Sequence, residues 1–169
     1  MAVAVDLTKR FQKLQEQRTQ EFHQLGKLQG KHLVLLIRLS VDQFHKIFLC
    51  HAPEYEKGFD DYKKGVSKVT DRFKEISKEI IVIKKTLIEE HPSTNIGPMI
   101  GKVQDLEEKK LNTVVDLQLA KQQALDNPGD ELCEKNADLI RAGLVKLEEQ
   151  ITEVLTEIRY ELVDIDPPA

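Results

Sequence analysis

A run of apolar residues spaced alternately four and three positions apart constrains this chain most. It begins at Tyr55, ends at Leu87 and continues through every intervening turn without a miss. Its members are Tyr55, Phe59, Tyr62, Val66, Val69, Phe73, Ile76, Ile80, Ile83 and Leu87. A 4-3 repeat places every member on one stripe of a helix, and a sustained repeat favours a left-handed supercoil with a partner helix. The sequence therefore predicts one long amphipathic helix, whose partner lies in this chain or in a second copy.

The end of this helix is marked by Pro92, because proline disfavours helical conformation in the residue before it. The segment "HPSTNIGPMIG" that follows contains two prolines and two glycines, which is typical of a connector. A new helix is expected after Pro98, and it keeps the same spacing at Met99, Val103, Leu106, Lys110, Thr113, Leu117, Ala120 and Ala124. The further residues Leu111, Val114, Val115 and Leu119 widen its apolar face, as expected in a helical bundle.

The segment "DNPGDE" predicts a second break. Asn127 is expected to cap the next helix, with Pro128 at its first position and acidic residues in its first turn. The same 4-3 spacing then recurs at Cys133, Ala137, Ile140, Leu144, Leu147, Ile151, Val154 and Ile158. A final helix is therefore predicted up to the closing Pro167-Pro168 pair.

The N-terminal segment predicts a first helix that begins at Asp6, a plausible cap. Its heptad positions hold Leu7, Phe11, Leu14, Leu25 and Leu28. The fold predicted from these four patterns is all-α: an elongated antiparallel bundle, or coiled coil, of three to four long helices. The length of 169 residues suits a single helical domain spanning residues 1–169.

The most apolar stretch of the chain, "HLVLLIRLSVDQFHKIFLCH", runs from His32 to His51. It contains Arg38, Asp42 and Lys46, and each charge would cost roughly 2.5–3.5 kcal/mol near the centre of a bilayer. Its apolar residues gather on one side of a helix, so a buried or partly buried helix is predicted. A membrane-surface helix is the alternative.

The net charge of −4 is unevenly distributed. Residues 1–51 carry 8 basic and 4 acidic side chains, whereas residues 99–169 carry 8 and 16. The candidate contacts to a nucleic acid or a protein partner are Lys9, Arg10, Lys13 and Arg18. A second basic run, from Lys63 to Lys74, is interleaved with acidic residues, and the sequence has no exposed runs of alternating aromatic and basic residues for base stacking. We therefore expect weak or no direct nucleic-acid binding.

Motifs for catalysis and cofactor binding are missing from the sequence. The glycines form no phosphate-binding loop, and no nucleophile elbow or zinc-protease motif is present. His45, Cys50 and His51 supply suitable zinc ligands, but their spacing matches no common zinc pattern. We expect no metal, no cofactor and no enzymatic activity.

The two cysteines and the N-terminus bear on the cellular compartment. Two scattered thiols form no disulfide framework and fit a reducing compartment. The N-terminus also lacks the charged, apolar and small-residue regions of a secretory signal.

Four segments point to a known family. They are "LTKRFQKLQEQRTQEFHQL", "YKKGVSKVTDRFKEISKEIIVIKKTL", "IGKVQDLEEKKLNTVVDLQLAKQQ" and "LVKLEEQITEVLTEIRYEL". In this order they resemble the required-for-excision 1-B domain family, most specifically at Leu14–Phe22 and Gln104–Glu107. The resemblance implies a non-enzymatic helical protein of DNA excision repair, located in the nucleus. It assigns no binding residues.

Residues 27–51 depart from the family pattern, which has a short linker at this place. We therefore interpret 27–51 as a possible inserted amphipathic segment. It could extend the first helix, pack as an extra short helix, or be poorly accommodated.

The function predicted from the sequence is that of a non-catalytic adaptor or scaffold in DNA repair, acting through protein contacts. The alternatives are a cytoskeletal or membrane-traffic coiled-coil tether and a direct DNA-binding accessory factor. A nuclear location follows from the resemblance, with the cytoplasm as the alternative. The identity of the partner, the type of lesion and the oligomeric state remain open, and a homo-oligomer is one option.

Overall fold

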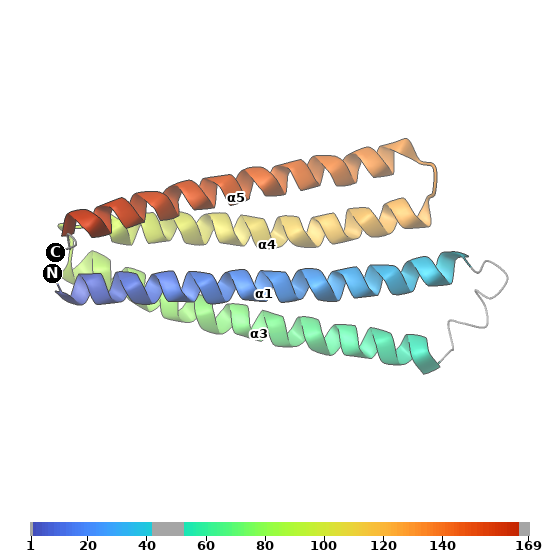
Figure 1. Ribbon diagram of the computed structural model, residues 1–169, viewed down its shortest axis with the longest axis horizontal. Coiled ribbons are helices and arrows are strands. Elements are labelled where there is room, and N and C mark those ends of the chain that lie inside the picture. Colours follow the sequence, from blue (N-terminus) through green and yellow to red (C-terminus); the bar gives the residue numbers. More distant parts are fainter. Residues whose placement is uncertain (1, 42–52, 166–169) are drawn as a thin grey trace. The chain divides into compact units, whose positions relative to one another are not determined.

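The computed structural model describes residues 2–41 and 53–165. These residues form four helices and no strand: α1 (Ala2–Val41), α3 (Pro53–Glu90), α4 (Ile96–Asp126) and α5 (Glu131–Ile165) (Figure 1). The all-α helical-bundle prediction is confirmed. The candidate metal ligands His45, Cys50 and His51 lie outside the described residues, as do residues 42–51 of the apolar stretch.

The chain divides into two compact units. Unit 1 comprises Met1–Gln15 and Ser77–Ala169, and unit 2 comprises Glu16–Ile76. Helices α1 and α3 each contribute to both units. Unit 1 therefore combines the two ends of the sequence, and the described residues of unit 2 belong to α1 and α3.

The core of unit 1 combines residues of the predicted stripes with Thr8, Ile96 and Ile100, which the stripes did not include. The largest fully buried side chains of this unit are Thr8, Phe11, Ile80, Leu87, Ile96, Ile100, Val103 and Ile158. Full burial of a large apolar side chain stabilises a fold by roughly 1.5–3 kcal/mol. The spacing of the stripes thus predicted which face of α3, α4 and α5 is buried.

The start of α1 differs from the prediction, since the helix begins at Ala2 rather than at Asp6. Ala4 and Val5 are buried, and the buried Thr8 hydroxyl donates a hydrogen bond of 2.7 Å to the Ala4 carbonyl. Burial of this extra turn outweighs the modest stabilisation that a cap at Asp6 would give.

A close approach joins α3 to α4 across their connector. A Cβ atom on Gly97 would lie only 2.6 Å from Cγ1 of Ile88 and 3.3 Å from its backbone nitrogen. Since no real Cβ atom comes that near, only glycine permits this approach. The connector itself is tied by Thr94, whose backbone N–H and hydroxyl both donate to the His91 carbonyl, at 3.1 and 3.0 Å.

In the α4–α5 turn, the residue that caps α5 differs from the predicted one. Asn127 closes α4 instead of starting α5, because its backbone N–H and its side-chain amide both donate to the Gln123 carbonyl. Gly129 then adopts a left-handed φ of 87°, which reverses the chain. Asp130 caps α5 by accepting the N–H of Leu132 at 2.9 Å.

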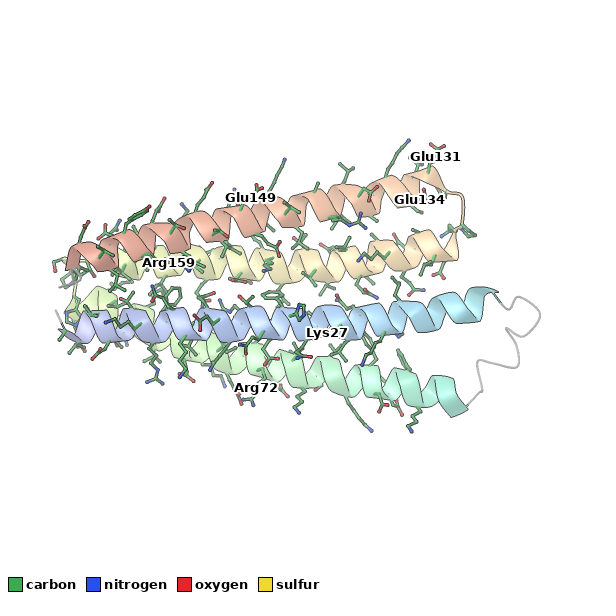
Figure 2. The ribbon with its side chains drawn as sticks, viewed as in Figure 1. Lys27, Arg72, Glu131, Glu134, Glu149 and Arg159 are labelled. Atoms are coloured by element: carbon green, nitrogen blue, oxygen red, sulfur yellow. The ribbon has the colours of Figure 1, made fainter. Side chains whose placement is uncertain are left out.

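The first turn of α5 carries Glu131 and Glu134, at the end of the hairpin formed by α4 and α5 (Figure 2). Carboxylates are stabilised there by the positive end of the helix dipole. Near this end, the buried seam between α4 and α5 consists of Leu117, Ala120 and Ala137, with Ile140 and Leu144 packed against it. The predicted wider face of α4 is wrong for Val115 and Leu119, which are exposed.

Unit 2 is an antiparallel pairing of α1 and α3. The rings of Phe22 and Phe73 lie 4.7 Å apart, and the ring of His32 stacks on Tyr62 at 4.3 Å. Residues later in α1 therefore contact residues earlier in α3, as in any pair of antiparallel helices. The 55–87 stripe is buried at Val69, Phe73 and Ile76, whereas Phe59 is exposed.

Residues 27–41 of the possible inserted segment continue α1 without a break, so here the segment extends the first helix. Within the described part of the chain, no helix combines the length and apolar character needed to cross a membrane.

Candidate partner-binding surface

The four basic residues predicted as contacts on α1 fall into two environments. Lys9, Arg10 and Lys13 are exposed, whereas Arg18 is only 3% exposed. The Arg10 guanidinium donates to Oε2 of Glu79 on α3 at 2.8 Å, which ties α1 to α3 within unit 1. Lys9 and Arg18 take part in interactions of their own. A partner contact at these four positions stays a prediction, and for Arg18 it would require the side chain to leave its buried position.

The basic run on α3 is largely neutralised by neighbouring carboxylates. Ion pairs join Lys63 to Asp60 (2.8 Å), Arg72 to Glu75 (3.0 Å) and Lys74 to Asp71 (3.4 Å). The hydrogen bond from Lys63, and then its charge, hold the pKa of Asp60 below its usual value. Arg72 extends from the outer side of α3 (Figure 2). Such exposed pairs add little stability. They do interrupt the positive charge, so this run forms no continuous track for a phosphate backbone.

An apolar surface lies on α3 beside the buried stripe. Ile81, Val82 and Ile88 are 52%, 64% and 46% exposed. We call these three residues and the lysines beside them the apolar–basic patch: Lys78, Ile81, Val82, Lys84, Lys85 and Ile88. The sequence reasoning missed this surface. The signal was present in the run Ile80–Ile83, since four consecutive apolar residues on a helix cannot all face one core.

The outer side of α5 is acidic. Some carboxylates are paired, as in Lys135–Glu131 (3.1 Å), Arg141–Asp138 (2.7 Å) and Lys110–Glu148 (3.3 Å). Glu149 and Arg159 lie further along the helix (Figure 2). The last turn of α5 contains no basic residue. The uneven charge seen in the sequence is thus expressed as an acidic helix surface, distinct from the basic residues on α1 and α3.

No reactive or metal-binding cluster is found among the described residues. No three His, Cys, Asp or Glu side chains there come close enough together to hold a metal ion. The Cys133 thiol lies 3.5 Å from Oδ2 of Asp130. Desolvation, the hydrogen bond to Asp130 and the charge of that carboxylate raise the pKa of Cys133. The thiolate, which is the nucleophilic form, is therefore disfavoured.

An aromatic cluster surrounds His32 in unit 2. Its imidazole stacks on Tyr62 with an interplanar angle of 10° and lies 5.7 Å from Phe59. The Lys63 ammonium sits 4.7 Å from the centre of the Phe59 ring. His32 Nδ1 is buried and has no hydrogen-bond partner among the residues that the structure describes. Burial lowers the pKa of His32 below 6.5.

The lowered pKa predicts that acid weakens unit 2. The unfolded chain binds a proton at His32 more readily than the folded chain, so stability falls as the pH drops through about 6.5. We expect His32→Gln to reduce the loss of stability between about pH 7.5 and 5.5, measured by urea unfolding. His23→Gln, an exposed histidine on the same helix, is the control. Equal pH dependence in His32→Gln and the unmutated protein would contradict the prediction.

Comparison with known proteins places these helices in a family. A family model described as DNA repair REX1-B matches residues 6–121, which is more than half of the chain. The chain belongs to the DNA repair REX1-B family. The matched span includes the apolar–basic patch and the exposed basic residues of α1. The resemblance seen in the sequence is therefore confirmed, and with it the association with DNA repair that the name of the family carries.

Two curated relatives extend the match. The chain is 26% identical over 156 residues to a required for excision 1-B domain-containing protein of Bos taurus, covering 92% of this chain and 75% of the relative. It is 27% identical over 156 residues to the protein of the same name in Mus musculus, covering 92% and 79%. No solved structure matches the chain.

Proposed function

We propose that this protein is a non-catalytic helical adaptor that brings proteins together during DNA repair, and that it acts in the nucleus. The family supplies the association with DNA repair. The observation that supports an adaptor role is the apolar–basic patch. Large apolar side chains left exposed beside charged residues on a surface are typical of protein-binding sites.

The electrostatic arrangement favours protein partners over a DNA-binding role. DNA binding by charge requires several basic side chains on one continuous face. On α3 three of the basic side chains are paired with neighbouring carboxylates, and on α1 Arg10 is paired with Glu79. The surface of α5 would repel a phosphate backbone. Protein partners can use the acidic and basic surfaces separately.

Affinity purification of the tagged full-length protein from its own cells, with and without ultraviolet damage, tests this proposal. We expect repair proteins to co-purify and the loss of the protein to slow the removal of lesions. Binding of purified protein to duplex DNA should remain in the non-specific range of about 10⁻⁴–10⁻⁶ M at physiological salt.

Three outcomes would contradict the proposal. Co-purification of vesicle or cytoskeletal proteins alone would favour a tether. Nanomolar DNA binding that disappears on charge reversal of Lys9, Arg10 and Lys13, but persists on charge reversal of Lys135, would favour a DNA-binding factor. Unchanged repair in cells lacking the protein would remove it from the pathway.

A further inference from the structure

Two apolar residues of the apolar–basic patch lower the stability of α3 as a helix. Ile81 and Val82 are β-branched, and β-branched residues are poorer helix formers than the lysine and glutamate found around them. Their burial does not compensate, since both are more than half exposed. Ile81 and Ile88 are seven residues apart and so lie on one line along α3, whereas Val82 is turned about 100° further around the helix and lies at the margin of this line. This spacing matches the way that apolar side chains of one helix contact another.

The charge beside Ile81 is mainly positive, from Lys78, Lys84 and Lys85, whereas Glu89 and Glu90 follow Ile88. Lys78 and Lys84 have no carboxylate partner among the described residues, and the ammonium of Lys85 is 3.8 Å from Glu89. Glu79 is two residues before Ile81, which places it on the opposite side of α3, where it pairs with Arg10. A ligand for this surface therefore needs negative charge beside its apolar atoms.

Helix α4 packs against one edge of the apolar–basic patch. Ile88 contacts α4 at Gly97, and Cδ of Lys84 lies 3.6 Å from the position that a Cβ atom on Gly101 would occupy. Gly97 lets α3 and α4 approach closely, so α4 packs behind Ile88 and beside Lys84. A supported side chain loses less conformational freedom on binding than a free one, which favours affinity.

We propose that the apolar–basic patch binds an amphipathic helix of a partner protein, whose apolar side chains contact Ile81, Val82 and Ile88 and whose carboxylates contact Lys78 and Lys84. This inference rests on the proposed adaptor function and specifies the chemistry of the partner. Exposed leucines elsewhere provide a contrast. Leu132 and Leu139 on α5 are 77% and 72% exposed, but they stand on a helix whose charge is mainly acidic.

The test uses the purified full-length protein and a synthetic amphipathic peptide of about 18 residues, long enough to form a helix. The peptide has leucines along one face and glutamates on both flanks, and a second peptide replaces every glutamate with lysine. Binding is followed by fluorescence anisotropy at low and at physiological salt. We expect the acidic peptide to bind, with an affinity that falls as salt rises, and the basic peptide to bind at least about tenfold more weakly, a difference of about 1.4 kcal/mol.

Two double variants locate the binding site. Ile81→Gln with Val82→Gln removes the apolar contacts, and Lys78→Gln with Lys84→Gln removes the charge while keeping most of each stem. Each should weaken acidic-peptide binding about tenfold or more, equivalent to about 1.4 kcal/mol. The matched control, Leu132→Gln with Leu139→Gln, should bind as the unmutated protein does. Helicity by circular dichroism should be unchanged in all three, since the substituted side chains are largely solvent-facing.

The inference is overturned if the acidic peptide does not bind, if the basic peptide binds as tightly, or if the leucine control weakens binding equally. It is also overturned if sedimentation shows a dimer of this chain that Ile81→Gln with Val82→Gln dissociates, because the occupant is then a second copy. These results are independent of the cellular test of the adaptor function. Repair proteins can co-purify through another surface when the peptide fails to bind, and the peptide can bind when no repair protein co-purifies.

Discussion

Replacing Ile76 with aspartate is expected to lower the free energy of unfolding by on the order of 4 kcal/mol. Ile76 is 6% exposed and lies in the middle of the 4-3 stripe. The substitution removes a buried apolar side chain and places a carboxylate where water cannot solvate it. In a chain of this size the loss corresponds to a fall of about 8–16 °C in the midpoint of thermal unfolding. Circular dichroism during thermal unfolding measures it.

The matched control is Ile81→Asp, the same change five residues further along α3. Ile81 is half exposed, so the new carboxylate stays hydrated and the effect on stability should lie within about 0.5 kcal/mol. A small effect at Ile76, or equal effects at the two positions, would show that the stripe is not buried and that the bundle is built differently.

Truncation of Phe11 to alanine is expected to lower the free energy of unfolding by about 3–5 kcal/mol. Phe11 is among the largest fully buried side chains. The loss combines the transfer energy of the ring with the energy of the cavity that it leaves, because the surrounding helices relax only partly. Urea unfolding at neutral pH gives this value directly.

Phe59→Ala provides the comparison for Phe11. Phe59 is 37% exposed and contacts His32 and Lys63 at the surface of unit 2. Since part of its ring already meets water, its truncation should cost less than half as much as that of Phe11. A larger loss at Phe59 would mean that the first turns of α1 contribute little to the core of unit 1.

The exposed residues show why the candidate surface was harder to predict than the fold. The periodicity of α3 indicated its buried face, but the 4-3 stripe did not include Ile81 and Val82. On α4 the residues Val115 and Leu119 were expected to widen the buried face, and they are exposed. Burial of a flanking residue depends on how many helices surround it, which a single helix pattern does not contain.

Arg18 shows that the exposure of a basic residue is also hard to predict from a helix pattern. A basic residue on a helix rich in lysine and arginine suggests a surface contact, yet its side chain is almost fully buried. Long charged side chains are rarely buried unless their charged end has a partner, and Arg18 does take part in an interaction. Only the packing around residue 18 distinguishes it from Lys13, which has the same charge and is exposed.

Sequence patterns alone predicted an all-α bundle of three to four helices, most of its buried faces and the family, because helical periodicity and family motifs extend over only a few turns of the chain. The tertiary structure alone decided the start of α1 at Ala2, the cap of α5 at Asp130 and the exposure of Ile81, Val82, Val115 and Leu119. Each depends on residues far away in the sequence or on the exact path of a turn. The free energy of burying a side chain is set by what surrounds it in space, and no periodicity within one helix specifies that.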